Sequence, residues 1–419
     1  MRYSKDLVAQ WKQLVKPGEV AEMAREAGFG QRLRKLIPRR VFWGVLLGFG
    51  VAPRRTLAGL ARFISHISGI SLSRQALHQR LSAQAADFFR RCFVRLTGRV
   101  VETIHEPLPG KLAIYKDCAL LDSTVLALAN RLARLFPACR TNVQKAALKI
   151  HARVSLTQQE VEAVLITGER VSDGKAVSLG QWVKGRLLLF DLGYLDYGFL
   201  KAIREAGGAF CSRLKTTSNA IITATREGCS KREIGGTLNR PIYRGPLVDL
   251  NAQFGRGEKT LVARVVGLWD SNIQDYHWFA TSLDPGQFTG SEVGQIYRLR
   301  WQIELLFKEW KSLLRLADLP SGNENIVMCL LYATLCISLL SRLMLWLAAR
   351  RNRVPWFEMS TPIAVSVLKD YAFILAKQAL SGRAANLRPL LDQILESLAL
   401  HGHQPHNTNA IMAFAATGG

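Results

Sequence analysis

The sequence has few features of a secreted or disulfide-bonded protein. Its seven cysteines are an odd number, lie far apart and include no C-x-x-C pair. This pattern argues against a disulfide framework and against a zinc site, and it favours a reducing cytoplasm. The N-terminal residues 1–16 are charged and lack a continuous apolar run, so they do not resemble a signal peptide.

Long apolar runs are also scarce, and one of them bears on a membrane location. Residues 326–341 carry no charge, but this stretch is shorter than the roughly 20 residues that a membrane-spanning helix needs. Arg342 follows it directly. We therefore predict a buried helix of a large core and no membrane partner, with a membrane anchor as the alternative.

Acidic residues are too few to balance the basic ones. The chain has 56 Lys and Arg against 32 Asp and Glu, which gives a net charge of +24. Such a charge predicts binding to a polyanion, first a nucleic acid and second an acidic membrane surface. The cations are spread over residues 32–40, 90–99, 131–149 and 298–315. This spread indicates a long contact surface, but it does not separate an enzyme from a coating protein.

The N-terminal region, residues 1–105, has apolar residues at helical spacing. Within it, residues 68–82 resemble the second half of a helix-turn-helix, because Gly69 suits the turn and Ser73 can cap the helix that follows. That helix would present Arg74, Gln75, His78 and Gln79 as DNA contacts. An ordinary helical bundle contains similar segments, so both interpretations stay open.

The pattern changes near residue 110 to short apolar runs that alternate with turns. We predict strands at 112–124, 145–156, 162–173, 186–191 and 209–215, with helical stretches at 176–185 and 197–207. This order gives an α/β fold with a mixed five-stranded sheet covered by helices. The predicted regions are residues 1–105 (helical), 106–215 (first part of the core), 216–275 (a β-rich insertion), 276–345 (second part of the core) and 346–419 (helical).

A predicted helix near residue 300 combines an apolar stripe with an ordered polar edge. Tyr297, Arg300, Glu304 and Lys311 fall within an arc of roughly 60° if the helix is regular. The neighbouring apolar sector contains Ile296, Leu299, Ile303, Leu306, Phe307, Trp310, Leu313 and Leu314. Taken alone, this pattern has a simpler interpretation, in which the helix packs in the core and its charged residues have no function beyond solvation.

Two aspartates favour a functional interpretation of this helix, because each stands at the end of an apolar run in a predicted strand. Asp122 and Asp191 would reach the edge of the sheet where ligands of α/β folds bind, although a strand-end Asp also serves as a turn former. Together with Glu304 they would offer three carboxylates, whose oxygens select Mg²⁺ or Mn²⁺. Two such ions promote in-line phosphoryl transfer. Arg300 and Lys311 would hold phosphates, and Tyr297 would donate to a phosphate or stack on a base.

At these residues the sequence resembles the DDE transposases of the insertion sequence 4 family. Tyr297, Arg300, Glu304 and Lys311 match all the spacings of the motif Tyr-x2-Arg-x3-Glu-x6-Lys, and ALLDST and LLLFDLGY match the places of the two aspartates. The resemblance covers about residues 105–345. One departure is the Ser-Thr pair after Asp122, where many relatives have Gly or Thr; Asp117 and Asp196 are the neighbouring alternatives.

The resemblance implies an RNase H-like core with a β-rich insertion and helical flanks. It also implies cut-and-paste transposition on double-stranded DNA: terminal inverted repeats are bound, strands are cleaved with two Mg²⁺ ions (Mn²⁺ as a substitute), and hairpin ends form. A homodimer would hold the two ends. A flipped base would rest on an aromatic side chain, here Trp269 or Trp278, which are otherwise core residues. The alternatives are an RNase H-like nuclease or resolvase, and a decayed DNA-binding protein.

Overall fold

The computed structural model describes residues 17–30, 36–51, 55–139, 143–215, 219–239, 243–257, 260–354, 358–381 and 384–403. It forms two compact units, each built from separate stretches of the chain. Among the described residues, the sheet unit contains residues 106–124 and 149–305, and the helical unit contains residues 17–105, 125–148 and 306–403. The predicted N-terminal region therefore begins, and the predicted C-terminal region ends, outside the described residues.

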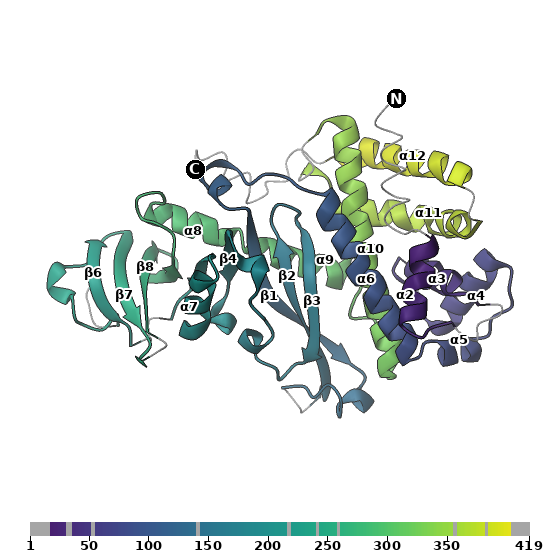
Figure 1. The fold of residues 1–419 in the computed structure, drawn as a ribbon, viewed down its shortest axis with the longest axis horizontal. Coiled ribbons are helices and arrows are strands. Elements are labelled where there is room, and N and C mark those ends of the chain that lie inside the picture. The colour runs from purple at the N-terminus through teal and green to yellow at the C-terminus, as the bar shows by residue number, and fades with distance from the viewer. Residues whose placement is uncertain are drawn as a thin grey trace. The chain divides into compact units, whose positions relative to one another are not determined.

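The strands of the described residues form one nine-stranded mixed sheet in the order β3-β2-β1-β4-β5-β9-β8-β7-β6 (Figure 1). β4 runs parallel to both β1 and β5, whereas β9, β8, β7 and β6 follow antiparallel. The mixed α/β fold that the sequence predicts is confirmed. The strands are β1 (Asp117–Leu128), β2 (Ala146–Ser155), β3 (Glu160–Gly168), β4 (Arg186–Phe190), β5 (Ala209–Arg213), β6 (Ile221–Glu227), β7 (Leu247–Phe254), β8 (Leu261–Asp270) and β9 (Asp275–Thr281).

The sheet is wider than the five strands predicted, because the insertion continues it. β9 pairs antiparallel with β5, with Cys211 opposite Thr281, and β8, β7 and β6 extend the sheet from there. An unpaired edge at β5 would expose a row of backbone donors and acceptors. β9, from the second part of the core, satisfies those groups, and the insertion strands β8, β7 and β6 continue the same sheet.

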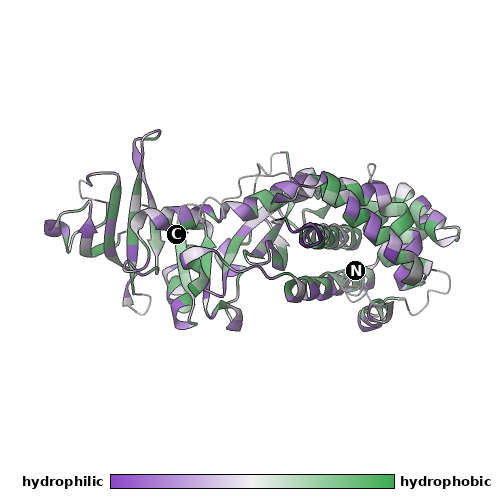
Figure 2. Ribbon diagram, turned by 90° about the horizontal axis from the view of Figure 1, so that it is seen from above, coloured by the Kyte–Doolittle hydropathy of each residue, from purple (hydrophilic) through white to green (hydrophobic). Residues whose placement is uncertain are grey.

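The centre of the sheet is apolar on both faces. All four residues from Leu187 to Phe190 of β4 are buried, and α7 (Tyr197–Glu205) buries Leu200 and Ile203 in the same core. A strand buried on both faces reads as a continuous hydrophobic run, which explains the sequence of β4. Figure 2 shows hydrophobic residues running along the strands and the packed helices.

One predicted helix of this region is absent. Residues 176–185 contain a single 3-10 turn, Gln181–Val183, in place of the predicted helical stretch. Gly180 precedes the turn, and Gly185 follows it with a φ of +75°, a left-handed backbone angle that ends a helical run. The two glycines therefore limit the segment to one turn.

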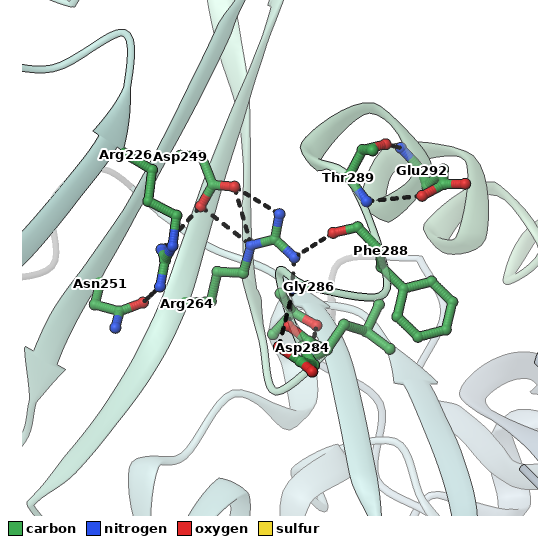
Figure 3. A network of polar contacts seen from close by, with 11 residues as sticks. Arg226, Asp249, Asn251, Arg264, Asp284, Gly286, Phe288, Thr289 and Glu292 are labelled. Carbon is green, nitrogen blue, oxygen red and sulfur yellow. Dashed lines mark hydrogen bonds and ion pairs between the residues drawn. The ribbon is translucent and has the colours of Figure 1, made fainter. Parts of the chain in front are cut away.

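A buried ion pair joins the insertion to the loop before α8 (Gly290–Arg298) (Figure 3). Arg264 of β8 donates to Asp249 of β7 at 2.6 Å and to the carbonyl oxygen of Phe288 at 2.7 Å. Removing one partner of such a pair leaves a buried charge and costs about 3–5 kcal/mol. Thr289 and Glu292 then form a capping box at the start of α8. These contacts fix where α8 begins.

The helical unit is built around one long apolar helix. Its α-helices outside the sheet unit are α2 (Pro17–Glu26), α3 (Pro38–Phe49), α4 (Leu57–Ser68), α5 (Arg74–Arg80), α6 (Ala83–Thr103), α10 (Glu324–Asn352), α11 (Thr361–Ser381) and α12 (Ala384–His401). α10 packs against α3, α6, α11 and α12. Helical N- and C-terminal regions thus flank the core, as the sequence predicts.

α10 contains the charge-free run of residues 326–341. Among the described residues it alone is long and apolar enough to cross a membrane, but 89% of its most apolar window is buried inside the protein. A helix that is hydrophobic all round and covered by other helices is a core helix. The prediction of a buried core helix is therefore confirmed.

Candidate active site

Asp122 and Asp191 occupy equivalent positions on neighbouring parallel strands. The paired register of β1 and β4 ends at Leu121 opposite Phe190, and each aspartate is the next residue. Neighbouring strands lie about 4.8 Å apart, so the register brings the two carboxylates to the same edge. β1 continues to Leu128, however, so Asp122 lies within a strand where the sequence predicts a strand end. The two aspartates therefore lie where the pairing of β1 with β4 ends, and not where β1 itself ends.

The helix that carries Glu304 is broken where the sequence predicts one regular helix. α8 ends at Arg298, and α9 spans Trp301–Ser312. Between them, the N–H groups of Leu299, Arg300, Gln302 and Ile303 donate to carbonyl oxygens three residues back, in place of the usual four. Arg300, which pairs with Asp122, lies within this tight turn.

Arg300 connects two of the three carboxylates. Its Nη1 donates to Oδ2 of Asp122 at 2.9 Å, and its Nη2 donates to Oε1 of Glu304 at 2.5 Å. The side chain of Arg300 is only 11% exposed. A buried guanidinium needs such partners, because an unpaired buried charge is strongly unfavourable. One positive charge therefore pairs with two carboxylates, those of Asp122 and Glu304.

Asp191 and Tyr297 form the second contact between the sheet and these helices. The Tyr297 hydroxyl donates to Oδ1 of Asp191 at 3.3 Å, and its ring packs on Phe279 of β9. Burial raises the pKa of Tyr297, so the phenol stays protonated and acts as a donor. Tyr297, Arg300 and Glu304 are thus brought to the two aspartates.

The carboxylates of Asp122, Asp191 and Glu304 influence one another electrostatically. Burial raises the pKa of Asp122 to about 6, and the nearby charges of Glu304 and Asp191 act in the same direction. The Ser123 N–H, which donates to Oδ1 of Asp122 at 2.7 Å, and Arg300 oppose that rise. A carboxyl group held at such a pKa is a feature of functional sites.

Asp117 and Asp196, the alternatives to the two aspartates, have structural partners. Asp117 begins β1, five residues before Asp122, and accepts a hydrogen bond from the Thr157 N–H at 2.9 Å. Asp196 caps α7 by accepting from the Phe199 N–H at 3.0 Å. The first contact joins the start of β1 to the turn after β2, and the second is a local helix cap.

The other predicted residues lie at different places. Lys311 is exposed on α9, two helical turns after Glu304 and on the same side of that helix. Ser73 caps α5 by accepting from the Ala76 N–H, and Gly69 ends α4 with a φ of +69°. The predicted turn and cap are therefore present. Arg74, Gln75 and His78 lie on α5, in the helical unit and not in the sheet unit.

The two tryptophans proposed to hold a base differ in exposure. Trp269 on β8 is 41% exposed and packs edge-on against Tyr276. Trp278 on β9 is buried, and its ring covers Gly267, where any side chain would collide with it. The structure thus places Trp278 in the core, where no face of its ring is free for a base.

Sequence reasoning missed two residues near the site. Trp301 begins α9 directly after Arg300 and is 56% exposed, an unusual exposure for a large ring. Asp173 follows β3 and accepts a hydrogen bond from the Ser123 hydroxyl. Asp173 ends the predicted strand 162–173, so the rule that selected Asp122 and Asp191 could also have selected it.

Comparison with known proteins identifies the arrangement. Residues 116–340 match the transposase DDE domain, and this match covers more than half of the chain. The chain belongs to the DDE transposase family. The transposase is therefore a polynucleotidyl transferase, and it contains the aspartates, the insertion and the Glu304 helix within the matched region.

Individual relatives support this assignment over most of the length. The transposase is 22% identical to the transposase of insertion sequence element IS231E from Bacillus thuringiensis subsp. finitimus, over 93% of this chain and 90% of that one. It is also 22% identical to the IS1151 transposase from Clostridium perfringens, over 77% of each chain. The piggyBac transposase in a synaptic complex with hairpin DNA has a similar structure, with a TM-score of 0.52 at 11% identity, over 96% of this chain and 86% of that one. The likeness supports an RNase H-like DDE fold.

Members of this family use divalent metal ions, and the donor chemistry of the site fits them. Asp122, Asp191 and Glu304 supply only carboxylate oxygens, which suit hard ions such as Mg²⁺. Among the described residues, no group of three or more His, Cys, Asp or Glu side chains is close enough to hold an ion. Instead, the Arg300 guanidinium lies between Asp122 and Glu304 and pairs with both. Binding an ion would require the guanidinium to move aside.

The raised pKa of Asp122 predicts how the stability of the transposase depends on pH. The fold holds this proton more tightly than the unfolded chain does, so the carboxyl group favours folding below pH 4 and opposes it as the pH rises through 6. Asp122→Asn should therefore raise the melting temperature at pH 8 by a few degrees, equivalent to about 1–3 kcal/mol, and not at pH 4. Thermal unfolding at both pH values measures this.

Asp270→Asn is the matched control. A backbone hydrogen bond from Asn272 and the contact with His277 lower the pKa of the partly exposed Asp270, so its charged form favours folding. This variant should lose stability at pH 8. If Asp122→Asn lowers the melting temperature equally at both pH values, the crowded-carboxylate account is wrong.

Proposed function

We propose that this transposase binds the terminal inverted repeats of an insertion sequence, cleaves their strands and transfers the ends to target DNA. The observation that carries the proposal is that Arg300 pairs with both Asp122 and Glu304 while Tyr297, three residues earlier, donates to Asp191. Cut-and-paste movement through hairpin ends is supported by the structural likeness to the piggyBac complex, whose DNA is a hairpin. The bacterial cytoplasm is where we expect the reaction to occur.

The three carboxylates are the proposed metal ligands, with two Mg²⁺ ions as the natural cofactor and Mn²⁺ as a substitute. When bound, two such ions would activate a water or a 3′-hydroxyl and stabilise the leaving oxygen. Asp122 and Asp191 are fixed on the sheet, whereas Glu304 comes from α9. Ligands on rigid strands and a helix hold the reacting groups more precisely than loop residues do.

The proposed role of Arg300 follows from its two present partners. Its guanidinium satisfies Asp122 and Glu304, and cations bound by these carboxylates would release its donors. A released guanidinium can then bind a phosphate of the DNA by two parallel hydrogen bonds. Tyr297 would keep Asp191 oriented, because its hydroxyl already donates to that carboxylate.

Hairpin formation requires a base to leave the DNA stack, and exposed aromatic rings can receive it. Trp301 is next to Arg300 on the chain and more than half exposed, which makes it the strongest stacking residue; Trp269 is the second. The burial of Trp278 removes it from the proposal.

The remaining DNA contacts belong to the helical unit. α5 begins at a capped turn and carries Arg74, Gln75 and His78, which we propose contact the inverted repeat as a recognition helix does. A homodimer holding both ends of the insertion sequence completes the proposed assembly.

Glu304→Gln tests the catalytic proposal. The variant keeps the shape of the side chain but loses a charged ligand, so cleavage should fall by more than about 100-fold, the loss that even an outer-shell partner can cause. DNA binding should persist, because one negative charge is removed from the surface that faces phosphates. The assay uses a DNA fragment carrying the gene with its native flanks, with Mg²⁺ or with EDTA.

Glu309→Gln is the control, since Glu309 lies on the same helix and pairs with Arg342. It should cleave like the wild type. Normal cleavage by Glu304→Gln would show that the active site lies elsewhere. A wild-type protein that binds but never cleaves would indicate a decayed copy, and cleavage without strand transfer would indicate a nuclease or resolvase.

Lys311→Ala tests the proposed phosphate contact. It should weaken binding to the DNA end and lower the slope of log affinity against log salt by about one. Lys369→Ala removes the same charge from the exposed surface of α11 and should leave the slope unchanged. Equal slopes for Lys311→Ala and the wild type would rule out a phosphate contact by Lys311.

A further inference from the structure

A fourth carboxylate, Asp173, contacts the residue that follows the proposed ligand Asp122 and has three polar neighbours. It begins the 3-10 turn Asp173–Lys175 after β3. The Ser123 hydroxyl donates to its Oδ1 at 2.8 Å, and Lys149 Nζ and His151 Nδ1 both lie 3.3 Å from the same oxygen. Asp173 is therefore held by β1 and β2 at once.

Both basic neighbours of Asp173 are themselves fixed. His151 is buried, and its Nε2 is 2.9 Å from the Thr167 hydroxyl of β3. Lys149 also donates to the Val171 carbonyl oxygen at 2.9 Å. Partial burial raises the pKa of Asp173, but the contacts from His151, Ser123 and Lys149 outweigh it and hold the pKa below its usual range. Asp173 therefore keeps its charge and its position.

On its other side, Asp173 packs against the turn that follows Asp191. A side-chain carbon placed on Gly193 would lie 2.7 Å from Oδ2 of Asp173, which is closer than real contacts. Gly193 belongs to the 3-10 turn Leu192–Tyr194. A side chain at this turn would therefore require the Asp173 carboxylate to shift from its present position.

Ser123 links Asp173 to the proposed metal ligand Asp122. Its hydroxyl donates to Asp173, while its backbone N–H donates to Oδ1 of Asp122 at 2.7 Å. The Ser123 peptide thus holds one oxygen of the Asp122 carboxylate, while Arg300 holds the other. Outer-shell partners of this kind orient metal ligands in many proteins.

We propose that Asp173 is a positioning residue that sets the orientation of Asp122 through Ser123 and supports the turn after Asp191. This inference rests on the proposed function of the two aspartates. Lys149 and His151 hold the Asp173 carboxylate in place, so the four side chains Ser123, Lys149, His151 and Asp173 act as one support for the active site.

Asp173→Ala tests the inference by removing both carboxylate oxygens, and with them the acceptor of the Ser123 hydroxyl. The rate constant of cleavage should fall about 10–100-fold, and Mn²⁺ measured by electron paramagnetic resonance without DNA should bind about 10–100-fold more weakly with unchanged stoichiometry. Affinity for the DNA end should not change. Asp173→Asn keeps one oxygen for the Ser123 hydroxyl and should recover part of both losses.

Two comparisons separate positioning from general stability. In a double-mutant cycle, Ser123→Ala should add little to the loss already caused by Asp173→Ala, because both break the same link. Asp117→Ala changes the first residue of β1, five residues before Asp122, and it should lower the melting temperature while Mn²⁺ affinity and the cleavage rate constant stay the same.

Failure of this inference is distinguishable from failure of the proposed function. If the wild type neither binds Mn²⁺ nor cleaves, the proposed function is wrong and the inference falls with it. If the wild type does both and Asp173→Ala matches it in affinity and rate, the inference alone is overturned. Additive losses in the cycle would likewise show that Asp173 does not act through Ser123.

Discussion

The site depends on how one guanidinium compensates for carboxylates that the sheet forces together. Two unit charges about 5 Å apart, the spacing of neighbouring strands, repel by roughly 3 kcal/mol at an effective dielectric constant of 20. Asp122 and Asp191 directly follow the last paired residues of β1 and β4, and Arg300 pairs Glu304 with Asp122. The fold tolerates the crowding because Arg300 is buried beside it. Such a cost is usual where a site must attract cations.

The elements around the site keep that arrangement in place. The Arg264–Asp249 pair and the capping box at Thr289 fix the start of α8, and Lys111 pairs with Glu292 at 2.6 Å. These contacts determine where the chain turns at Arg300. The Asp173 carboxylate accepts a hydrogen bond from Ser123, the residue after Asp122, and lies against the turn after Asp191. The chain thus supports the three carboxylates from the helix and from the sheet.

Much of the fold followed from local sequence patterns. The continuous apolar run of β4 gave a strand buried on both faces, with Asp191 directly after it. The apolar sector of the Glu304 helix is buried as predicted, except for the partly exposed Leu313. The break at Arg300 was not predictable, because neither glycine nor proline marks it and only the hydrogen bonds to carbonyl oxygens three residues back define it.

Other features depend on contacts between distant segments. Trp278 is buried because β8 places Gly267 opposite it, a pairing that spans a hairpin and leaves no local mark. The predicted five-stranded sheet and the predicted β-rich insertion form one continuous sheet because β5 pairs with β9, about 70 residues later in the sequence. Asp173 contacts Ser123, 50 residues away, and that contact is visible only in three dimensions.

The most direct test of the account is a structure of the transposase bound to a DNA end with Mn²⁺, located by its anomalous scattering. We expect Mn²⁺ bound by Asp122, Asp191 and Glu304, with the Arg300 guanidinium turned from these carboxylates onto a phosphate. Mn²⁺ at other residues, or Arg300 still joining Asp122 to Glu304 with the DNA end bound, would contradict it.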